Sequence, residues 1–324
     1  MISRRYLAAC GVLASLAFFA ANGASAQEFP AKALRVVTAE PGGGNDFAAR
    51  LLAHGMTASM GRQVIVENRG GASGAIAAQI VAKSTPDGYT LLLYSGALWT
   101  IPLLKSDVPW NAFKDFAPLS LVARSPSVLV VALSLPVTSV QDLIALARAK
   151  PGELNYASGS TGASTHLAAE LFKSMAGVNI VRVAYKGNAA GYTDMLGGRI
   201  QLLFGTVAGA TPFIKSGRLR AIAVTSAEPS PLFPDLPTVS ASGLPGYESV
   251  SIYGMFAPAG VPAAIVSRLN QEIVRVIRSP DIKEKFFSAG VEGVGSSPQE
   301  LTAAMKAETA RLAKNIKNIG ITAL

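Results

Sequence analysis

Two stretches rich in glycine and hydroxyl side chains carry the residues best suited to bind an anion. The first reads Pro41-Gly42-Gly43-Gly44-Asn45-Asp46, and the second reads Ser158-Gly159-Ser160-Thr161-Gly162 and is followed by Ser164. Each lies between a predicted strand and a predicted helix. The start of a helix offers N–H groups without intrahelical partners and about half a positive charge. Glycine lets an anion approach this backbone closely, and the hydroxyl groups add further donors. Two such clusters facing each other would clamp a carboxylate.

A purely structural role for both stretches is the main alternative, because glycine turns are common in α/β folds. Asp46 has its own alternatives: it could cap its helix, hold the glycine loop, or bind a hydroxyl or amine of the substrate.

Other chemistry finds little support in the motifs. The sequence has no G-x-G-x-x-G or G-x-x-x-x-G-K-[ST] nucleotide motif and no G-x-S-x-G nucleophile elbow. It has two histidines. We interpret His54, inside a predicted helix, as a surface or packed residue. His166 follows the second loop, and its proximity to Ser160 or Ser164 leaves a secreted serine-type hydrolase as an alternative. Such an enzyme also needs an acidic orienting residue and an oxyanion hole, and no residue is marked for either role. We favour His166 as a hydrogen-bond donor that organises the loop or faces the ligand. No metal cluster and no cofactor motif stands out.

The first 26 residues have the pattern of an export signal. Arg4 and Arg5 precede the apolar stretch Leu7 to Ala21, and Ala24-Ser25-Ala26 forms an A-x-A cleavage site. The apolar stretch is shorter than the roughly 20 residues of a membrane span. General secretion is preferred over twin-arginine export, and Cys10, the single cysteine, is interpreted as part of the signal. The mature chain is therefore expected in the periplasm, without disulfides or thiolate metal sites.

The formal net charge of +9 is spread along the 324 residues rather than gathered in runs. Such a field favours small anionic ligands, although it could equally be a soluble basic surface without a partner. Nucleic-acid binding is a poor fit, because no basic helix carries interleaved aromatic residues.

Strands and helices must alternate to position the two loops. The predicted strands cover residues 34–39, 64–67, 90–94, 117–123, 128–133, 154–157, 180–183, 202–204, 221–224 and 249–256. The predicted helices cover residues 46–60, 73–83, a segment starting at Ser139, 164–175, 189–196, 208–216, 262–278 and a last segment capped by Ser297. This alternation predicts mostly parallel sheets. Two separate strand–loop–helix units indicate two lobes, with crossings at residues 128–133 and in the proline-rich passage 229–245.

A series of short motifs resembles one known family over nearly the whole mature chain. The motifs are residues 29–32 (FPAK), 41–50 (PGGGNDFAAR), 66–74 (VENRGGASG), 86–92 (PDGYTLL), 154–158 (LNYAS), 166–172 (HLAAELF), 184–187 (AYKG) and 257–262 (APAGVP). In this order they resemble the substrate-binding receptors of tripartite tricarboxylate transporters, also called the Bug family.

The resemblance implies a two-lobed periplasmic binding protein of type II-like α/β fold, with a ligand cleft between the lobes. Residues 27–127 with 249–324 would form lobe one, and residues 128–248 would form lobe two. The ligand would be a mono-, di- or tricarboxylate or an aromatic acid. It would be held by loops near Gly42 to Asp46 and Ser158 to His166, with Ser95, Gly96 and Thr206 completing the cleft. The expected partner is a membrane permease, and a monomer is expected. A ligand-sensing partner of a membrane kinase remains a further alternative.

Three positions depart from the pattern that this family often shows. Phe204 is followed by Gly205 instead of aspartate, Ala184 replaces a proline before Tyr185, and Tyr253 replaces a tryptophan. These departures bear on the choice of ligand rather than on the fold.

Overall fold

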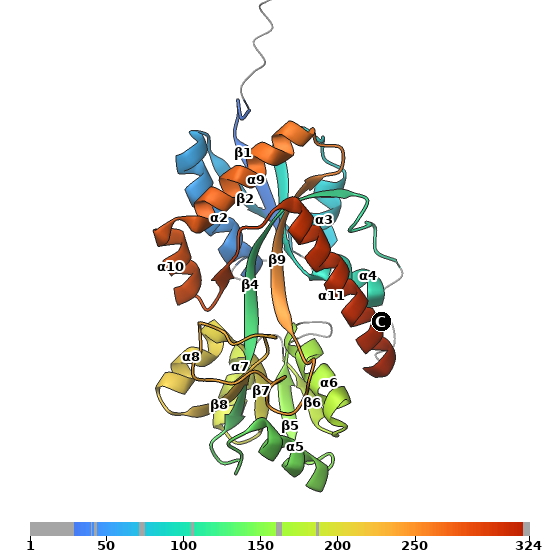
Figure 1. Ribbon diagram of the computed structural model, residues 1–324, viewed down its shortest axis with the longest axis vertical. Coiled ribbons are helices and arrows are strands. Elements are labelled where there is room, and N and C mark those ends of the chain that lie inside the picture. The colour runs from blue at the N-terminus through green and yellow to red at the C-terminus, as the bar shows by residue number, and fades with distance from the viewer. Residues whose placement is uncertain are drawn as a thin grey trace, which may run out of the picture.

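The computed structural model describes residues 29–39, 41, 44–70, 75–104, 107–159, 164–185 and 188–319. They form two lobes joined by two long strands, β4 (Phe116–Ala132) and β9 (Val250–Pro258), which pass from one lobe into the other (Figure 1). The predicted leader, residues 1–26, lies outside the described residues, as does the predicted helix start at Ser73. Within the described part of the chain, no helix combines the length and the apolar character that a bilayer crossing needs.

The sheet of lobe one combines parallel and antiparallel strands. Strands β1 (Leu34–Thr38), β2 (Val64–Asn68) and β3 (Thr90–Ser95) are parallel, in the order β2-β1-β3. Antiparallel to β3 comes β9, followed by β4 and the short β10 (Glu292–Gly293). The parallel strands are apolar because helices cover both faces of the sheet.

Lobe two repeats this arrangement around the second half of β4. The parallel strands are β5 (Asn155–Ser158), β6 (Val181–Ala184) and β7 (Leu202–Thr206). Both β7 and β8 (Leu219–Val224) pair antiparallel with β4. The predicted α/β architecture is present, with fewer parallel pairs than expected, because β4 in both sheets and β9 in the sheet of lobe one run antiparallel to their neighbours.

Helices cover both faces of each sheet (Figure 1). Lobe one carries α2 (Gly44–Met60), α3 (Ala75–Ala82), α4 (Ala97–Leu104), α9 (Ala263–Arg278), α10 (Pro280–Ser288) and α11 (Pro298–Ile319). Lobe two carries α5 (Val140–Ala149), α6 (Ser164–Ala176), α7 (Asn188–Leu196) and α8 (Val207–Lys215). Alternate strand residues face opposite cores: Val36 and Val37 belong to different apolar clusters, as do Val128 and Leu129.

The prediction of two separate strands at 117–123 and 128–133 is wrong, because β4 is continuous through Pro126. Pro126 is the last β4 residue in register with β9, opposite Val250, and pairing with β7 begins at Ser127. The missing N–H of proline thus falls where one ladder ends and the next begins, where a strand tolerates it.

Two helices and one short strand were not expected from the sequence. Helix α4 is apolar on all sides and contains Pro102, so it lacks a helical period. Helix α10 begins directly after α9, with Ser279 between them. The predicted helix starts at Ser139 and Ser297 are confirmed: the N–H groups of Asp142 and Glu300 donate to these serine hydroxyls over 3.1 Å and 3.2 Å.

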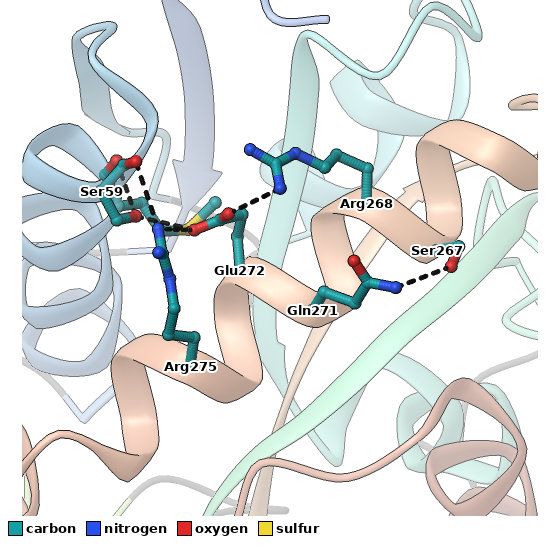
Figure 2. Close-up of polar contacts among 7 residues, drawn as sticks. Ser59, Ser267, Arg268, Gln271, Glu272 and Arg275 are labelled. Atoms are coloured by element: carbon teal, nitrogen blue, oxygen red, sulfur yellow. Dashed lines mark hydrogen bonds and ion pairs between the residues drawn. The ribbon is translucent and has the colours of Figure 1, made fainter.

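A buried carboxylate joins α2 to α9 at the outer end of lobe one (Figure 2). Glu272 is 3% exposed, and its oxygens accept from Ser59 Oγ at 2.8 Å and Arg275 Nη2 at 2.6 Å. Arg268 Nη1 lies 3.0 Å from its other oxygen. This network lies near the last turn of α2. The other end of this helix, at Gly44, lies roughly 24 Å away by helical rise and faces lobe two.

Candidate functional site

Strand directions place two sets of carboxyl ends opposite each other. Strands β1, β2 and β3 run antiparallel to β9, which runs antiparallel to β4, so these three run toward lobe two. Strands β5, β6 and β7 run against β4 and therefore toward lobe one. Ligands of open α/β sheets bind beyond carboxyl strand ends. The boundary between the lobes is thus the candidate site.

Most of the predicted site residues that are described lie at these strand ends. In lobe one, Ser95 ends β3 and Gly44 begins α2, after an exposed Pro41. In lobe two, Ser158 ends β5 and Ser164 begins α6. Thr206 ends β7 and caps α8, accepting from the N–H of Gly209 at 3.3 Å. Five further predicted residues lie outside the described part of the chain: Gly42, Gly43, Ser160, Thr161 and Gly162.

Asp46 is 5% exposed and takes part in a network that spans the first glycine loop. Its oxygens lie 2.9 Å from Arg50 Nε and accept from Asn68 Nδ2 at 2.8 Å. The same Asn68 amide donates to the carbonyl oxygen of Ala39 at 3.1 Å, and Arg50 Nη2 donates to Asn68 Oδ1. Residues 39 and 46 flank the loop, so Asn68 ties both of its ends together. These contacts favour the loop-holding alternative for Asp46.

In lobe two, an arginine holds the second loop much as Asn68 holds the first. Arg182 on β6 donates from Nε to Ser158 Oγ at 2.8 Å and from Nη2 to the carbonyl oxygen of Gly159 at 2.9 Å. The N–H of Gly159 donates to Thr165 Oγ1 at 3.1 Å. Arg182 and Thr165 therefore hold Ser158 and Gly159 at the start of the second loop. The guanidinium also brings a positive charge to the strand ends that face lobe one.

His166 is 5% exposed, in the first turn of α6. Burial, followed by the charge of Arg182, lowers the pKa of His166 to about 4. The imidazole is therefore neutral at physiological pH. Ser164 lies two residues earlier on the same helix, and residues at this spacing do not face each other. These two residues do not form the nucleophile and base of the hydrolase alternative.

The backbone N–H of Gly96 already has a hydrogen-bond acceptor within the protein. Its N–H donates to the carbonyl oxygen of Ile252 at 2.9 Å. A Cβ at this position would lie 3.1 Å from Glu308 Oε2, and this carboxylate accepts from Trp99 Nε1 at 2.9 Å. Of the neighbouring pair, Ser95 is thus the better placed to contact a ligand.

Two tyrosine hydroxyls lie close to glycines at the strand and helix ends near the lobe boundary. A Cβ on Gly44 would lie 2.3 Å from Tyr253 Oη, and a Cβ on Gly205 would lie 1.9 Å from Tyr192 Oη. Tyr253 lies opposite Ser95 in the pairing of β9 with β3. Asn45, the second residue of α2, has a buried Oδ1 with no hydrogen-bond partner among the described residues. Tyr192 Oη is likewise buried without a partner.

The sequence did not single out Arg182 or Thr165, and it marked Asn68 and Tyr253 only through the family resemblance. Asn68 and Arg182 lie on strands adjacent to the loops that they hold. Only the order of the strands in the sheet brings each side chain to its loop. Position could have indicated Asn68, because it directly follows the predicted strand at residues 64–67. Among the described residues, no group of three or more His, Cys, Asp or Glu side chains could hold a metal ion.

Comparisons with known proteins agree on one group. The family of tripartite tricarboxylate transporter receptors matches residues 48–321. The structure of Rpa4515 from R. palustris with adipate is similar at 37% identity and a TM-score of 0.81, covering 92% of this chain and 100% of that one. The periplasmic binding protein BugD is similar at 31% identity and a TM-score of 0.77, covering 91% and 99%. MatC from Rhodopseudomonas palustris with bound malate is similar at 26% identity and a TM-score of 0.74, covering 89% and 100%.

Proposed function

Because the chain belongs to the family of tripartite tricarboxylate transporter receptors, we propose that it binds a small organic carboxylate between its lobes and presents it to a transporter permease. The chain is a solute receptor with the α/β periplasmic binding protein fold, and its family consists of binding proteins rather than enzymes. Relatives of known structure were solved with adipate and with malate, which are both dicarboxylates.

The observation that carries this proposal is the opposition of two sets of strand ends, each with a loop held by side chains. Lobe one offers the start of α2, and lobe two offers the start of α6 with Arg182 beneath it. Backbone N–H groups at helix starts and a guanidinium both favour a negative ligand.

A ligand that contacts both lobes stabilises the closed arrangement over the open one. Charge-assisted hydrogen bonds contribute roughly 1.5–3 kcal/mol each. A few of them, less the cost of ordering the groups involved, amount to about −8 kcal/mol, which corresponds to a Kd of about 1 μM. The permease would recognise the closed form.

Titration calorimetry with adipate, malate and the corresponding diamides tests the proposal. We expect at least one acid to bind with a Kd of about 1 μM, and its diamide to bind about 100-fold more weakly, because the amide lacks the charge. Equal binding of the acid and its diamide, or no binding of any carboxylate, would contradict the proposal. Native mass spectrometry of the purified protein would identify a carboxylate that copurifies.

A variant of Arg182 tests the lobe-two half of the site. Arg182→Lys keeps the charge but cannot reach Ser158 and Gly159 with the same fork of donors, so we expect the Kd to rise at least about tenfold. Arg148→Lys is the matched control. Arg148 also donates to a backbone carbonyl in lobe two, that of Ala176 at 2.8 Å, but at the opposite end of α6. An equal loss in both variants would contradict a role for Arg182 in the site.

We further propose the lobe boundaries given by the sequence, residues 27–127 with 249–324 and residues 128–248. The change of β4 partners between Pro126 and Ser127 supports them. Export with removal of residues 1–26 is part of the same proposal, and an intact mass that begins at Gln27 is the expected measurement. Sedimentation is expected to show a monomer.

A further inference from the structure

We propose that Asn45 and Tyr253 recognise a hydroxyl group of the ligand, so that the receptor selects hydroxy acids over carboxylates of the same skeleton without the hydroxyl. This inference rests on the proposed function, because it assigns a substrate class to the same cleft. Three observations support it: the state of the Tyr253 hydroxyl, the state of the Asn45 amide, and the position of both residues at the start of α2.

The Tyr253 hydroxyl makes no hydrogen bond with the described residues, unlike the hydroxyls of three other tyrosines. Tyr156, Tyr185 and Tyr247 donate to Glu170, Asp194 and the carbonyl oxygen of Ala168, respectively. Tyr253 is partly exposed, and its Oη is not one of the fully buried polar atoms that lack a hydrogen-bond partner. Burial of the ring raises the pKa of Tyr253, which keeps the phenol protonated. The hydroxyl can therefore both donate and accept.

The Asn45 side chain supplies an acceptor without a donor. Asn45 Oδ1 is buried and unpaired within the described residues, and a buried acceptor in this state costs free energy that a suitable donor would recover. Asn45 is the second residue of α2, at the start of the helix that faces lobe two.

The two groups lie close together at this helix start. A Cβ on Gly44 would lie 2.3 Å from Tyr253 Oη, so standard backbone dimensions place this oxygen within about 8 Å of the Asn45 Cα. Register ties the tyrosine to the cleft as well, because Tyr253 lies opposite Ser95, the last residue of β3. Both residues therefore lie at the start of α2, the helix end that faces lobe two.

A hydroxyl is the ligand group that suits this pair. It can donate to Asn45 Oδ1 and accept from Tyr253. A carboxylate only accepts, so it would meet Asn45 Oδ1 as a second acceptor, and an ammonium only donates, so it would leave Tyr253 without an acceptor. The Tyr253 hydroxyl supplies an oxygen that can accept as well as donate. A site that hydrogen-bonds a hydroxyl discriminates strongly against the analogue that lacks it.

Calorimetry with matched acids on the full mature protein tests the inference. Malate and succinate differ by one hydroxyl, as do citrate and tricarballylate. We expect the hydroxy member of at least one pair to bind at least about tenfold more tightly. In Tyr253→Phe and Asn45→Ala, this preference should fall to about twofold or less, while the affinity for the acid without the hydroxyl changes little.

Tyr89→Phe is the matched control. Tyr89 Oη accepts from the N–H of Ala31 at 2.8 Å, and Tyr89 directly precedes β3, at the end of the strand remote from lobe two. This variant should keep the preference. A melting temperature close to that of the parent protein would show that each variant is folded. For any variant that fails this criterion, Tyr253→Trp replaces Tyr253→Phe and Asn45→Asp replaces Asn45→Ala, with the same loss of preference expected.

The outcomes separate this inference from the proposed function. If both members of each pair bind equally, or if Tyr253→Phe keeps the preference, the hydroxyl inference is wrong and the carboxylate receptor stands. If adipate binds and no hydroxy acid does, the same conclusion follows. If no carboxylate binds, both proposals fall.

Discussion

Asn68 Nδ2 donates to Asp46 Oδ1 over 2.8 Å, and this contact joins the end of β2 to the first turn of α2. The same amide donates to the carbonyl oxygen of Ala39, on the other side of the glycine loop. One side chain thus holds both flanks of a loop whose three consecutive glycines carry no side chains with which to hold it. Asp46 stabilises this arrangement, so its negative charge near a site for anions has a structural use.

Asn68→Ala should weaken ligand binding more than it weakens the fold. Loss of the three side-chain hydrogen bonds should lower the free energy of unfolding by about 1–2 kcal/mol, while the Kd should rise about tenfold because the loop is no longer held. Calorimetry and urea unfolding measure the two effects. Asn111→Ala is the control, because Asn111 Oδ1 accepts only from backbone N–H groups of an exposed turn, at Phe113 and Lys114. The loop-holding role fails if Asn68→Ala binds as tightly as this control.

Gly205→Ala should destabilise lobe two, because the added Cβ would lie 1.9 Å from Tyr192 Oη. Overpacking of this kind costs about 1–3 kcal/mol. Tyr192→Phe alone should be neutral or stabilising, because the hydroxyl is buried without a partner. In the double variant the nearest ring carbon remains 3.0 Å from the Cβ, so we expect about half of the loss to be recovered. A double-mutant cycle in urea measures the coupling, and additive effects would rule out the contact.

Glu272→Ala should lower the free energy of unfolding by about 2 kcal/mol, because it removes a buried carboxylate from Ser59, Arg268 and Arg275 (Figure 2). The two arginines are 46% and 59% exposed, so they regain water and the loss stays below that of a fully buried pair. Arg268→Ala, at the exposed side of the network, should cost less than about 1 kcal/mol. Both variants should bind ligand normally, because the network lies at the outer end of α2. Equal destabilisation by the two variants would argue against the buried carboxylate as its centre.

Glu308 should make the protein less stable as the pH rises. Burial raises the pKa of Glu308 to about 7 from an ordinary value of 4.5, despite opposing effects of Arg311 and the Trp99 hydrogen bond. The folded state therefore binds this proton more tightly than the unfolded state, and the contribution to stability falls between pH 4.5 and 7. Glu308→Gln should match the parent protein near pH 4.5 and exceed it by about 2 kcal/mol above pH 7, after allowance for solvent screening.

Glu300 provides a control of opposite sign for the same unfolding series. Hydrogen bonds from Ser297 lower the pKa of Glu300 below 4.5. Its stabilisation is therefore present at neutral pH and is lost as the pH falls through the folded pKa. Glu300→Gln should be less stable than the parent at pH 7, and the difference should shrink in acid. A parallel pH dependence of the two glutamine variants would contradict both assignments.

Local sequence signals predicted the repeating units well. Residues 34–60 were recognised as a strand, a glycine loop and a helix, and the caps at Ser139 and Ser297 lie where hydroxyl and acidic residues indicated them. Such signals depend on neighbours within four residues. For the same reason the two loops could be located, and the strand directions then place their flanks at facing ends.

Features set by distant residues could not be predicted in this way. Strand β4 is continuous because β7 replaces β9 as its partner after Pro126. Local propensity does not encode such a change of partner. The partners of Ser158 and Asp46 lie 24 and 22 residues away, on adjacent strands. Helix α4 has no polar face, so its pattern cannot be distinguished from that of a buried strand.

The position of β9 in the sheet sets an order of events during biosynthesis. Strand β3 pairs with β9 at Leu92 to Ser95, and β4 pairs with β9 from Phe116 to Pro126. The sheet of lobe one therefore cannot be completed until residues 250–258 have been synthesised. A nascent or translocating chain that stops short of Val250 leaves one edge of β3 open, and an open apolar edge invites aggregation. We therefore expect the amino-terminal strands to be prone to aggregation until β9 has been synthesised.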